Sequence, residues 1–447
     1  MPPVKPPASS RSVKSLATAA EAGRHQREWF AELRRRVAAG EPFALLNADV
    51  PHEIFRTMDI PYVVGQWWAS LVTAKQRSGH YLDLVRQRGY PDYSEQYNAV
   101  TLGSAFDPEP DEGPWGGLPK PDIIVGEATG DVTRKIFDIW GHEPGVTFFP
   151  LESAAENEVP VNWWELMPHR WEEAVGSARL DLLTAELENL VRFLETTTGR
   201  RFEESRFREV MALVNEQEEW NRKARDLIAR ARPAPLSVVD SIPSVMLPQW
   251  HRGTEWARDL ARSFYEEVRE RVEAGVGVCR DERARLMWIG RGLWYDMGFY
   301  QRFQEEYGAV FVWSMYLAIA ADGYIRYGDD PMRALAARFA AFGDQLYTPP
   351  WSSEWYVKEA RLHGIDGVVH LVSDDPRGSY FTARALESAG FPVIEVHADN
   401  VDTRTFGGDV ADRVAQWLET VVLPRAGSSR ASAVSTISDA SFAAGGS

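Results

Sequence analysis

The sequence predicts an α/β protein with two flavodoxin- or Rossmann-like parallel-sheet domains joined by a helical middle segment. Short apolar runs rich in Val, Ile and Phe alternate with helical stretches on both sides of the middle, and such runs are typical of parallel strands covered on both faces. In the middle itself, leucines recur at spacings of three and four, which is the pattern of an amphipathic helix. A chain of 447 residues is also too long to fold around a single hydrophobic core of ordinary size.

The first domain is expected over residues 41–165, after a disordered N-terminus and a leading helix within residues 1–40. Its turn-flanked apolar runs predict four strands, at 43–47, 61–65, 122–126 and 146–151. Helical stretches at 51–58 and 131–140 lie between them. This alternation of strand and helix favours a layered parallel sheet.

The middle segment, residues 166–248, is expected to hold a helical hairpin and a linker. The periodic leucines place one apolar face on the first helix, and Gly199 is a plausible stop signal. Phe207 restarts the pattern in a second helix. The proline-rich stretch 232–248 is predicted to be the linker.

The second domain is expected over residues 249–424, followed by a disordered tail at 425–447. Its predicted strands are 284–290, 310–315, 367–373 and 392–397. Its predicted helices include 334–342, 380–389 and 409–422. Because each domain has four candidate strands, the two are interpreted as distant structural repeats, and the loops after their strands are the expected ligand-binding edge.

The composition excludes several classes of function. A net charge of −16 argues against a broad nucleic-acid or anionic-membrane surface. No apolar run approaches the roughly 20 residues that span a bilayer, and the N-terminus lacks an apolar signal-peptide core, so we expect a cytoplasmic protein. Cys279 is the single cysteine, which excludes an intrachain disulfide and any site built from several thiolates of this chain.

An ordered series of segments between about residues 40 and 420 resembles the subunits of the 2-hydroxyacyl-CoA dehydratase and benzoyl-CoA reductase family. The segments are LLNADVPHEIF at 45–55 with DIP at 59–61, FLETTTG at 193–199 with Asn215, DP at 330–331, GIDGVV at 364–369, and GFPVI at 390–394. No single segment is specific for this family, but the series of segments in this order is. The resemblance implies a two-domain subunit that acts on acyl-CoA or aryl-CoA thioesters in a dimer with a related subunit.

The resemblance also implies a [4Fe–4S] cluster held by three loop cysteines, and here this chain departs from the family pattern. Gly130 and Asp374 stand where two of the cysteines are expected, and the third position falls near Glu95. Cys279 matches none of them. Cluster iron requires thiolates, so we expect no metal and no cofactor in this chain; a [4Fe–4S] cluster belongs to the partner subunit, and CoA enters as part of the substrate.

The catalytic residue stays open, with Glu95, Glu127 and Asp374 as candidates for acid–base chemistry. Two ordinary explanations compete with these roles. Asp131 starts a predicted helix, where the macrodipole favours a carboxylate. Asp374 and Asp375 precede another predicted helix, where capping explains them equally well.

The residues expected to line the substrate cleft follow predicted strands. They are Gln66, Trp67, Gly130, Asp131, Asp375, Arg291 and Gly292. The Trp67 indole either stacks on an acyl group or adenine or is simply packed in the core. The glycine-bearing loop at Arg291 and Gly292 either receives a CoA phosphate on backbone N–H groups or is a plain strand–helix turn.

The sequence therefore predicts a cluster-free subunit of a dehydratase-like or benzoyl-CoA reductase-like enzyme. Two alternatives remain open. One is a repurposed, redox-free lyase or hydratase on acyl-CoA, since acid–base catalysis alone contributes roughly 10²–10⁴-fold. The other is a non-catalytic scaffold or thioester-binding subunit.

Overall fold

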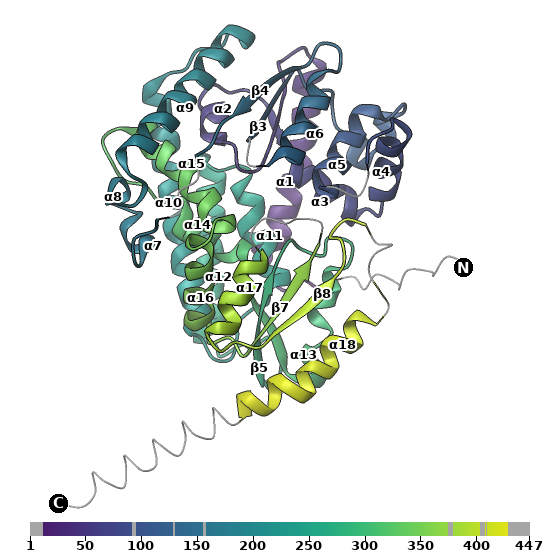
Figure 1. Cartoon of the computed structure of the whole chain (residues 1–447), viewed down its shortest axis with the longest axis vertical. Helices are drawn as coiled ribbons and strands as arrows, with labels where there is room; N and C mark the ends of the chain where they lie inside the picture. The colour runs from purple at the N-terminus through teal and green to yellow at the C-terminus, as the bar shows by residue number, and fades with distance from the viewer. Residues whose placement is uncertain are drawn as a thin grey trace, which may run out of the picture.

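Two four-stranded parallel sheets form the framework of the protein (Figure 1). The computed structural model describes residues 12–91, 95–127, 130–154, 158–373, 379–402, 407 and 409–427. The first sheet contains β1 (Ala44–Leu46), β2 (Tyr62–Val64), β3 (Ile123–Glu127) and β4 (Thr147–Leu151). The second contains β5 (Ala284–Ile289), β6 (Ala309–Ser314), β7 (Gly367–Val372) and β8 (Val393–His397). All eight predicted strands are confirmed.

The two sheets have the same topology. Their strand orders are β2-β1-β3-β4 and β6-β5-β7-β8, with every neighbouring pair parallel. Both orders are the flavodoxin-like one, in which the chain reverses direction across the sheet between its first and third strands. The predicted fold class and the relation between the two halves are thus confirmed, while the domain boundaries remain predictions.

Helices surround both sheets. In the first half they are α1 (Ala17–Ala38), α2 (His52–Thr57), α3 (Gly65–Ala74), α4 (Ser78–Gln87), α5 (Gln96–Gly103), α6 (Asp131–Gly141), α7 (Trp163–Leu166) and α8 (Trp171–Val175). The middle contributes α9 (Ser177–Thr198), α10 (Glu204–Arg230), α11 (Val238–Gln249) and α12 (Glu255–Glu273). The second half adds α13 (Gln304–Tyr307), α14 (Met315–Gly323), α15 (Pro331–Tyr347), α16 (Trp351–His363), α17 (Ser379–Ser388) and α18 (Val410–Trp417), which continues as a π-helical turn, Leu418–Val422. Short 3₁₀ turns are η1 (Ser104–Phe106), η2 (Pro110–Glu112), η3 (Pro114–Gly116) and η4 (Met297–Gln301).

The two helices predicted for the middle segment form as α9 and α10, but they pack mainly on other helices, α9 on α15 and α10 on α12 and α14, rather than on each other. The five periodic leucines of α9 are all buried, and Gly199 ends the helix in the left-handed conformation that glycine adopts without a steric penalty. The proline-rich stretch after α10 differs from the predicted linker, because most of it forms α11. Pro243 and Pro248 each remove one helical hydrogen bond, but α11 is almost entirely buried against α1, α12 and α14, and this packing offsets the loss.

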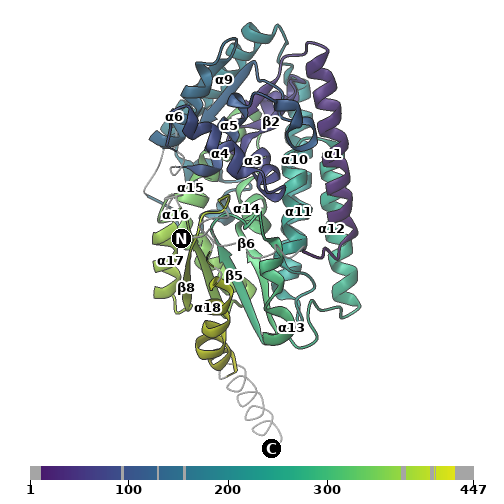
Figure 2. The same cartoon turned by 90° about the vertical axis from the view of Figure 1, so that its right-hand side faces the viewer.

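The helices α1, α10, α11 and α12 run side by side along one edge of the molecule, next to both sheets (Figure 2). The N-terminal helix therefore packs mainly on elements that follow it by more than two hundred residues. Within the described parts of the chain, no helix is both long and apolar enough to cross a membrane.

A buried carboxylate with two arginine partners joins the halves. Glu53 of α2 lies 2.7 Å from Arg252 and 2.6 Å from Arg338 of α15. Burial alone would raise the pKa of Glu53, but the two guanidinium groups lower it to about 2. Glu53 is therefore charged throughout the physiological range, and its ion pairs fix the first half against α15.

Glu218 of α10 is also buried, but among the described residues no arginine or lysine forms an ion pair with it. It accepts hydrogen bonds from the side-chain amides of Gln217 (3.1 Å), Asn221 (2.9 Å) and Gln249. Burial raises its pKa to about 7, although these amides favour the charged form. The folded protein thus keeps a proton on Glu218 over a pH range in which an exposed glutamate has released it.

We expect Glu218→Gln to stabilise the protein at pH 8 and to have little effect near pH 4.5. Below the ordinary pKa of 4.5 the carboxyl is protonated in both states; between pH 4.5 and about 7 only the unfolded chain loses the proton, so wild-type stability falls. At about 1.4 kcal/mol per pH unit, the deficit above pH 7 reaches about 3 kcal/mol. Urea unfolding at pH 4.5 and pH 8 measures the difference in the free energy of unfolding between the variant and the wild type. Glu216→Gln is the control, because Glu216 is exposed. A gain that does not depend on pH would contradict this assignment.

Candidate functional site

A cavity of about 550 Å³ lies between the two sheets. Its walls include Ala48 after β1, Gln66 after β2, Arg291 after β5 and Tyr316 after β6. These positions follow the carboxyl ends of the first two strands in each sheet. In open parallel sheets this edge is where ligands bind, so the cavity is the candidate site.

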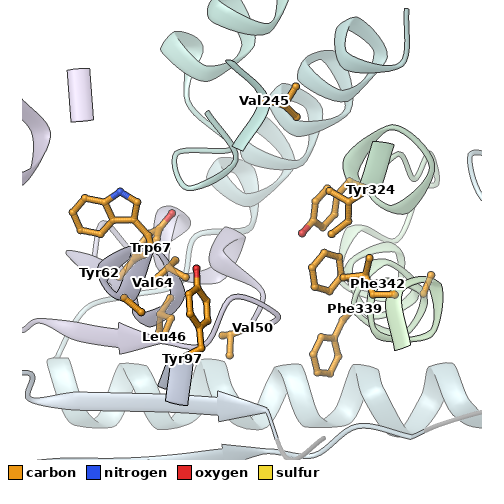
Figure 3. Packing of buried hydrophobic residues seen from close by; sticks show 14 of the residues in the cluster. Leu46, Val50, Tyr62, Val64, Trp67, Tyr97, Val245, Tyr324, Phe339 and Phe342 are labelled. Atoms are coloured by element: carbon orange, nitrogen blue, oxygen red, sulfur yellow. The ribbon is translucent and has the colours of Figure 1, made fainter. Parts of the chain in front are cut away.

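Aromatic side chains form much of the cavity wall. Trp67 and Tyr97 approach it from the first half, and Phe342 of α15 lies on the opposite side (Figure 3). Trp115 and Trp294 add further rings. An apolar wall with few polar groups is typical of a small-molecule site, and this one suits the acyl chain or a planar ring of a ligand.

A polar network crosses the cavity floor between the halves. The Gln66 amide donates to Asn47 Oδ1 and, at 3.1 Å, to Asn98 Oδ1, while Gln66 Oε1 accepts the N–H of Ala48 at 2.8 Å. Asn98 in turn donates to Glu95 Oε2 at 3.3 Å. These bonds orient the Gln66 amide, which lines the cavity, whereas Asn47, Asn98 and Glu95 support it without lining the wall.

Arg291 completes the network from the second sheet. Its Nη2 lies 3.6 Å from Glu95 Oε2, and its guanidinium stacks 4.6 Å from the ring centre of Tyr97. Burial, followed by nearby Tyr316, raises the pKa of Tyr97 well above its ordinary value, so the phenol stays neutral. The result is a buried cation, oriented by an acid and a ring, in the wall of an apolar cavity.

Three of the predicted cleft residues, Gln66, Trp67 and Arg291, meet in this cavity. Gly292 follows Arg291, but its N–H donates to the Tyr316 hydroxyl at 3.3 Å. The helix expected directly after it is not formed, since the chain reaches the 3₁₀ turn η4 instead. The loop therefore contributes the Arg291 side chain rather than a helix N-terminus to the site.

The remaining candidates lie elsewhere or outside the described residues. Glu95 is buried behind Arg291 in a left-handed conformation, φ 51°, and does not itself line the cavity. Glu127 is buried at the end of β3, also away from the cavity wall. Gly130 is exposed in extended backbone before α6. The side chain of Asp131, the first residue of α6, and all of Asp374 and Asp375 lie outside the described residues.

The residues present do not fit an iron–sulfur cluster. The whole chain has one cysteine, Cys279, which lies between α12 and β5, and burial followed by Glu282 raises its thiol pKa. A Cβ at Gly130 would meet no described atom within 4 Å, and glycine itself has no side chain that could bind iron. Across the ranges that the structure covers, no three His, Cys, Asp or Glu side chains are grouped to hold a metal ion.

Sequence reasoning missed several parts of the cavity wall, including Tyr97 of α5, residues of α11 and α15, and the two parts described next. Trp115 comes from η3, in a loop of glycines and prolines that contains no strand or helix period. Lys14, Gln26 and Arg27 come from the N-terminal segment and α1. No local pattern identifies them, because they reach the site through packing of α1 on α11. Tyr316, by contrast, directly follows a predicted strand, in one of the loops expected at this edge.

Comparison with known proteins gives a consistent result. The family model described as 2-hydroxyglutaryl-CoA dehydratase, D-component, matches residues 47–421. The (R)-phenyllactyl-CoA dehydratase alpha subunit of Clostridium sporogenes is 23% identical over 398 residues, covering 86% of this chain and 91% of that protein. The (R)-2-hydroxyisocaproyl-CoA dehydratase alpha subunit of Clostridioides difficile is 20% identical over 396 residues, covering 85% and 90%.

Both relatives are subunits of enzymes, which agrees with the expectation that this chain is part of one. The family-model match covers seven of the eight strands, the helical middle and the cavity-lining residues from Ala48 onward. The resemblance inferred from the ordered segments is therefore confirmed, and the chain belongs to the 2-hydroxyglutaryl-CoA dehydratase D-component family.

Proposed function

We propose that this chain is a cluster-free, cytoplasmic subunit of a 2-hydroxyacyl-CoA dehydratase-like enzyme that pairs with a related subunit. One observation carries the proposal: the chain has a ligand-sized cavity at the strand ends of a dehydratase-family fold, yet its single cysteine lies elsewhere. The relatives found are dehydratase subunits, which favours a dehydratase over a benzoyl-CoA reductase.

The cavity supports thioester binding without a cluster in this chain. Its aromatic wall suits the acyl group, and the Arg291 guanidinium is placed to donate to the thioester carbonyl oxygen. A positioned cation in a water-poor site stabilises negative charge that develops on such an oxygen. Glu95 acts as a positioning residue, because it holds the guanidinium without lining the cavity, whereas Tyr97 both stacks on the guanidinium and forms part of the wall. Electron-transfer chemistry is left to a cysteine-bearing partner.

Co-expression with a related cysteine-bearing subunit tests the proposal. We expect a stable complex whose iron and acid-labile sulfide stay with the partner, and a CoA species bound to this chain, detected by native mass spectrometry. The chain purified alone should contain no stoichiometric iron. Iron in the isolated chain would contradict the cluster-free assignment.

The same preparation separates the alternatives. Turnover of an acyl-CoA by the isolated chain without reductant would favour a redox-free lyase or hydratase. A stable complex in which Arg291→Met leaves turnover unchanged would favour a scaffold. Of the three carboxylates predicted as acid–base candidates, Glu95 and Glu127 do not line the cavity and Asp374 lies outside the described residues; the acidic residue found in the described wall is Asp49.

A further inference from the structure

We infer that Lys14 and Arg27 form a phosphate-binding subsite at the mouth of the cavity, which takes the nucleotide end of a CoA thioester. The inference rests on the proposed function and adds a part of the site that lies outside the family match, since that match begins at residue 47. It assigns a binding role to the N-terminal strap, residues 12–16, and to the first turns of α1.

The charge of the cavity wall differs from that of the protein. The chain as a whole carries −16. The cavity wall nevertheless has three cationic residues, Lys14, Arg27 and Arg291, and only one acidic residue, Asp49, among the described residues. A concave surface lined by cations has a positive electrostatic potential, which attracts anionic ligands even on an acidic protein. The cavity therefore favours a ligand with negative charge.

The three cations occupy two levels of the cavity. Arg291 is only 4% exposed and lies at the strand ends, whereas Lys14 and Arg27 are exposed and mark the mouth. A CoA thioester has two groups that cations can bind at opposite ends of the molecule, the phosphates at one end and the thioester carbonyl at the other. With the thioester against Arg291, the pantetheine arm runs along the aromatic wall, and the phosphates face Lys14 and Arg27.

The strap holds Lys14 in place from both sides. The Gln301 side chain pairs with residue 13, accepting the Val13 N–H and donating to its carbonyl, each at 2.9 Å. Asp240 of α11 accepts the N–H groups of Ser15 at 2.6 Å and Leu16 at 3.2 Å. Because the backbone is fixed on either side of Lys14, less conformational entropy is lost when the ammonium meets a ligand.

The start of α1 is fixed as firmly. Glu267 of α12 accepts the N–H groups of Ala17 at 2.7 Å and Thr18 at 3.1 Å, as well as the Thr18 hydroxyl at 2.9 Å. These contacts satisfy the first N–H groups of α1. They also set the rotation of the helix, which turns Gln26 and Arg27 toward the cavity.

A carboxylate, Asp240, lies near the mouth cations, but it forms no direct ion pair with either of them. Among the described residues, neither Lys14 nor Arg27 forms an ion pair or a side-chain hydrogen bond with a carboxylate. Although Lys14 is exposed as a whole residue, partial burial of its ammonium lowers the pKa; Asp240 raises the pKa, and Arg27 lowers it by less than Asp240 raises it. Like charges placed together destabilise each other, and an anion bound between them removes that repulsion. The carboxylate of Asp240 is already engaged by the strap.

Titration calorimetry on the full chain tests the inference with three probes: CoA, 3′-dephospho-CoA and pantetheine. Lys14→Ala and Arg27→Ala should each weaken CoA binding about 10-fold, because each removes a hydrogen bond to a charged group. Pantetheine affinity should not change. Equal losses for CoA and dephospho-CoA would identify the diphosphate as the bound group, and a loss confined to CoA would identify the 3′-phosphate.

Arg24→Ala is the matched control, since Arg24 is an exposed arginine on α1 that does not line the cavity. All three side chains are exposed, and thermal unfolding should confirm that each variant folds. If both mouth variants bind CoA as tightly as the wild type, the subsite is refuted and the proposed function stands. If the wild type binds none of the CoA compounds, alone or with its partner, the proposed function itself fails.

Discussion

Replacing Arg225 by Met should lower the stability of the fold by about 3–5 kcal/mol. Arg225 of α10 lies 2.9 Å from Asp322 of α14 and 2.7 Å from Glu359 of α16, and all three side chains are buried. Burial alone would raise the pKa of Asp322, but Arg225 and Lys358 lower it below its ordinary value. Without Arg225, two buried carboxylates share the single ammonium of Lys358.

The midpoint of thermal or urea unfolding measures this effect, with circular dichroism as the signal. Arg206→Met is the matched control, because Arg206 lies on the same helix but forms only an exposed pair with Glu209. Exposed pairs of this kind contribute at most about 1 kcal/mol. A loss in Arg225→Met no larger than in the control would show that the buried group of charges does not stabilise the fold.

Replacing Arg291 by Met should reduce kcat/KM of the assembled enzyme by about 10²–10³-fold, the usual effect of removing one donor to a developing oxyanion. The same change leaves Glu95 buried without its cation, so it should also lower the melting temperature. The two effects are separable. In the double variant Arg291→Met/Glu95→Gln, no carboxylate is left behind, and stability should return while activity does not.

Arg302→Met provides the control for this pair. Arg302 lies in the same segment after β5 and pairs with Asp296 at 2.5 Å, but does not line the cavity. Its loss should leave turnover within a few-fold of wild type. Recovery of activity in the double variant would mean that Arg291 acts only on stability and does not touch the substrate.

The strands could be predicted because their signal is local. A run such as 284–290 is apolar at nearly every position, and a strand buried on both faces requires that pattern. Arg291 and Gln66 could be placed at the site for a related reason: each follows a recognisable strand, and parallel strands bring their carboxyl ends to one edge. The eight strand positions and part of the site thus follow from the sequence alone.

The rest depends on contacts between distant segments. The prolines of α11 indicate irregular structure, and only the burial of that helix against α1 and α14 reverses the local preference. Lys14 reaches the cavity through Asp240 and Gln301, which lie more than two hundred residues away. Glu95 stays a predicted catalytic candidate, but its pairing with Arg291 could not be predicted, because that contact forms only when the second sheet is in place.

The ion pairs of Glu53 also determine how the molecule can move. Glu53 belongs to the first half, whereas Arg252 lies between α11 and α12 of the helical middle and Arg338 lies on α15 of the second half. A hinge motion that moves the two sheets apart would also separate these buried charges, at a cost of several kcal/mol. These ion pairs therefore oppose a motion that separates the two sheets, which favours ligand exchange at the rim of the cavity.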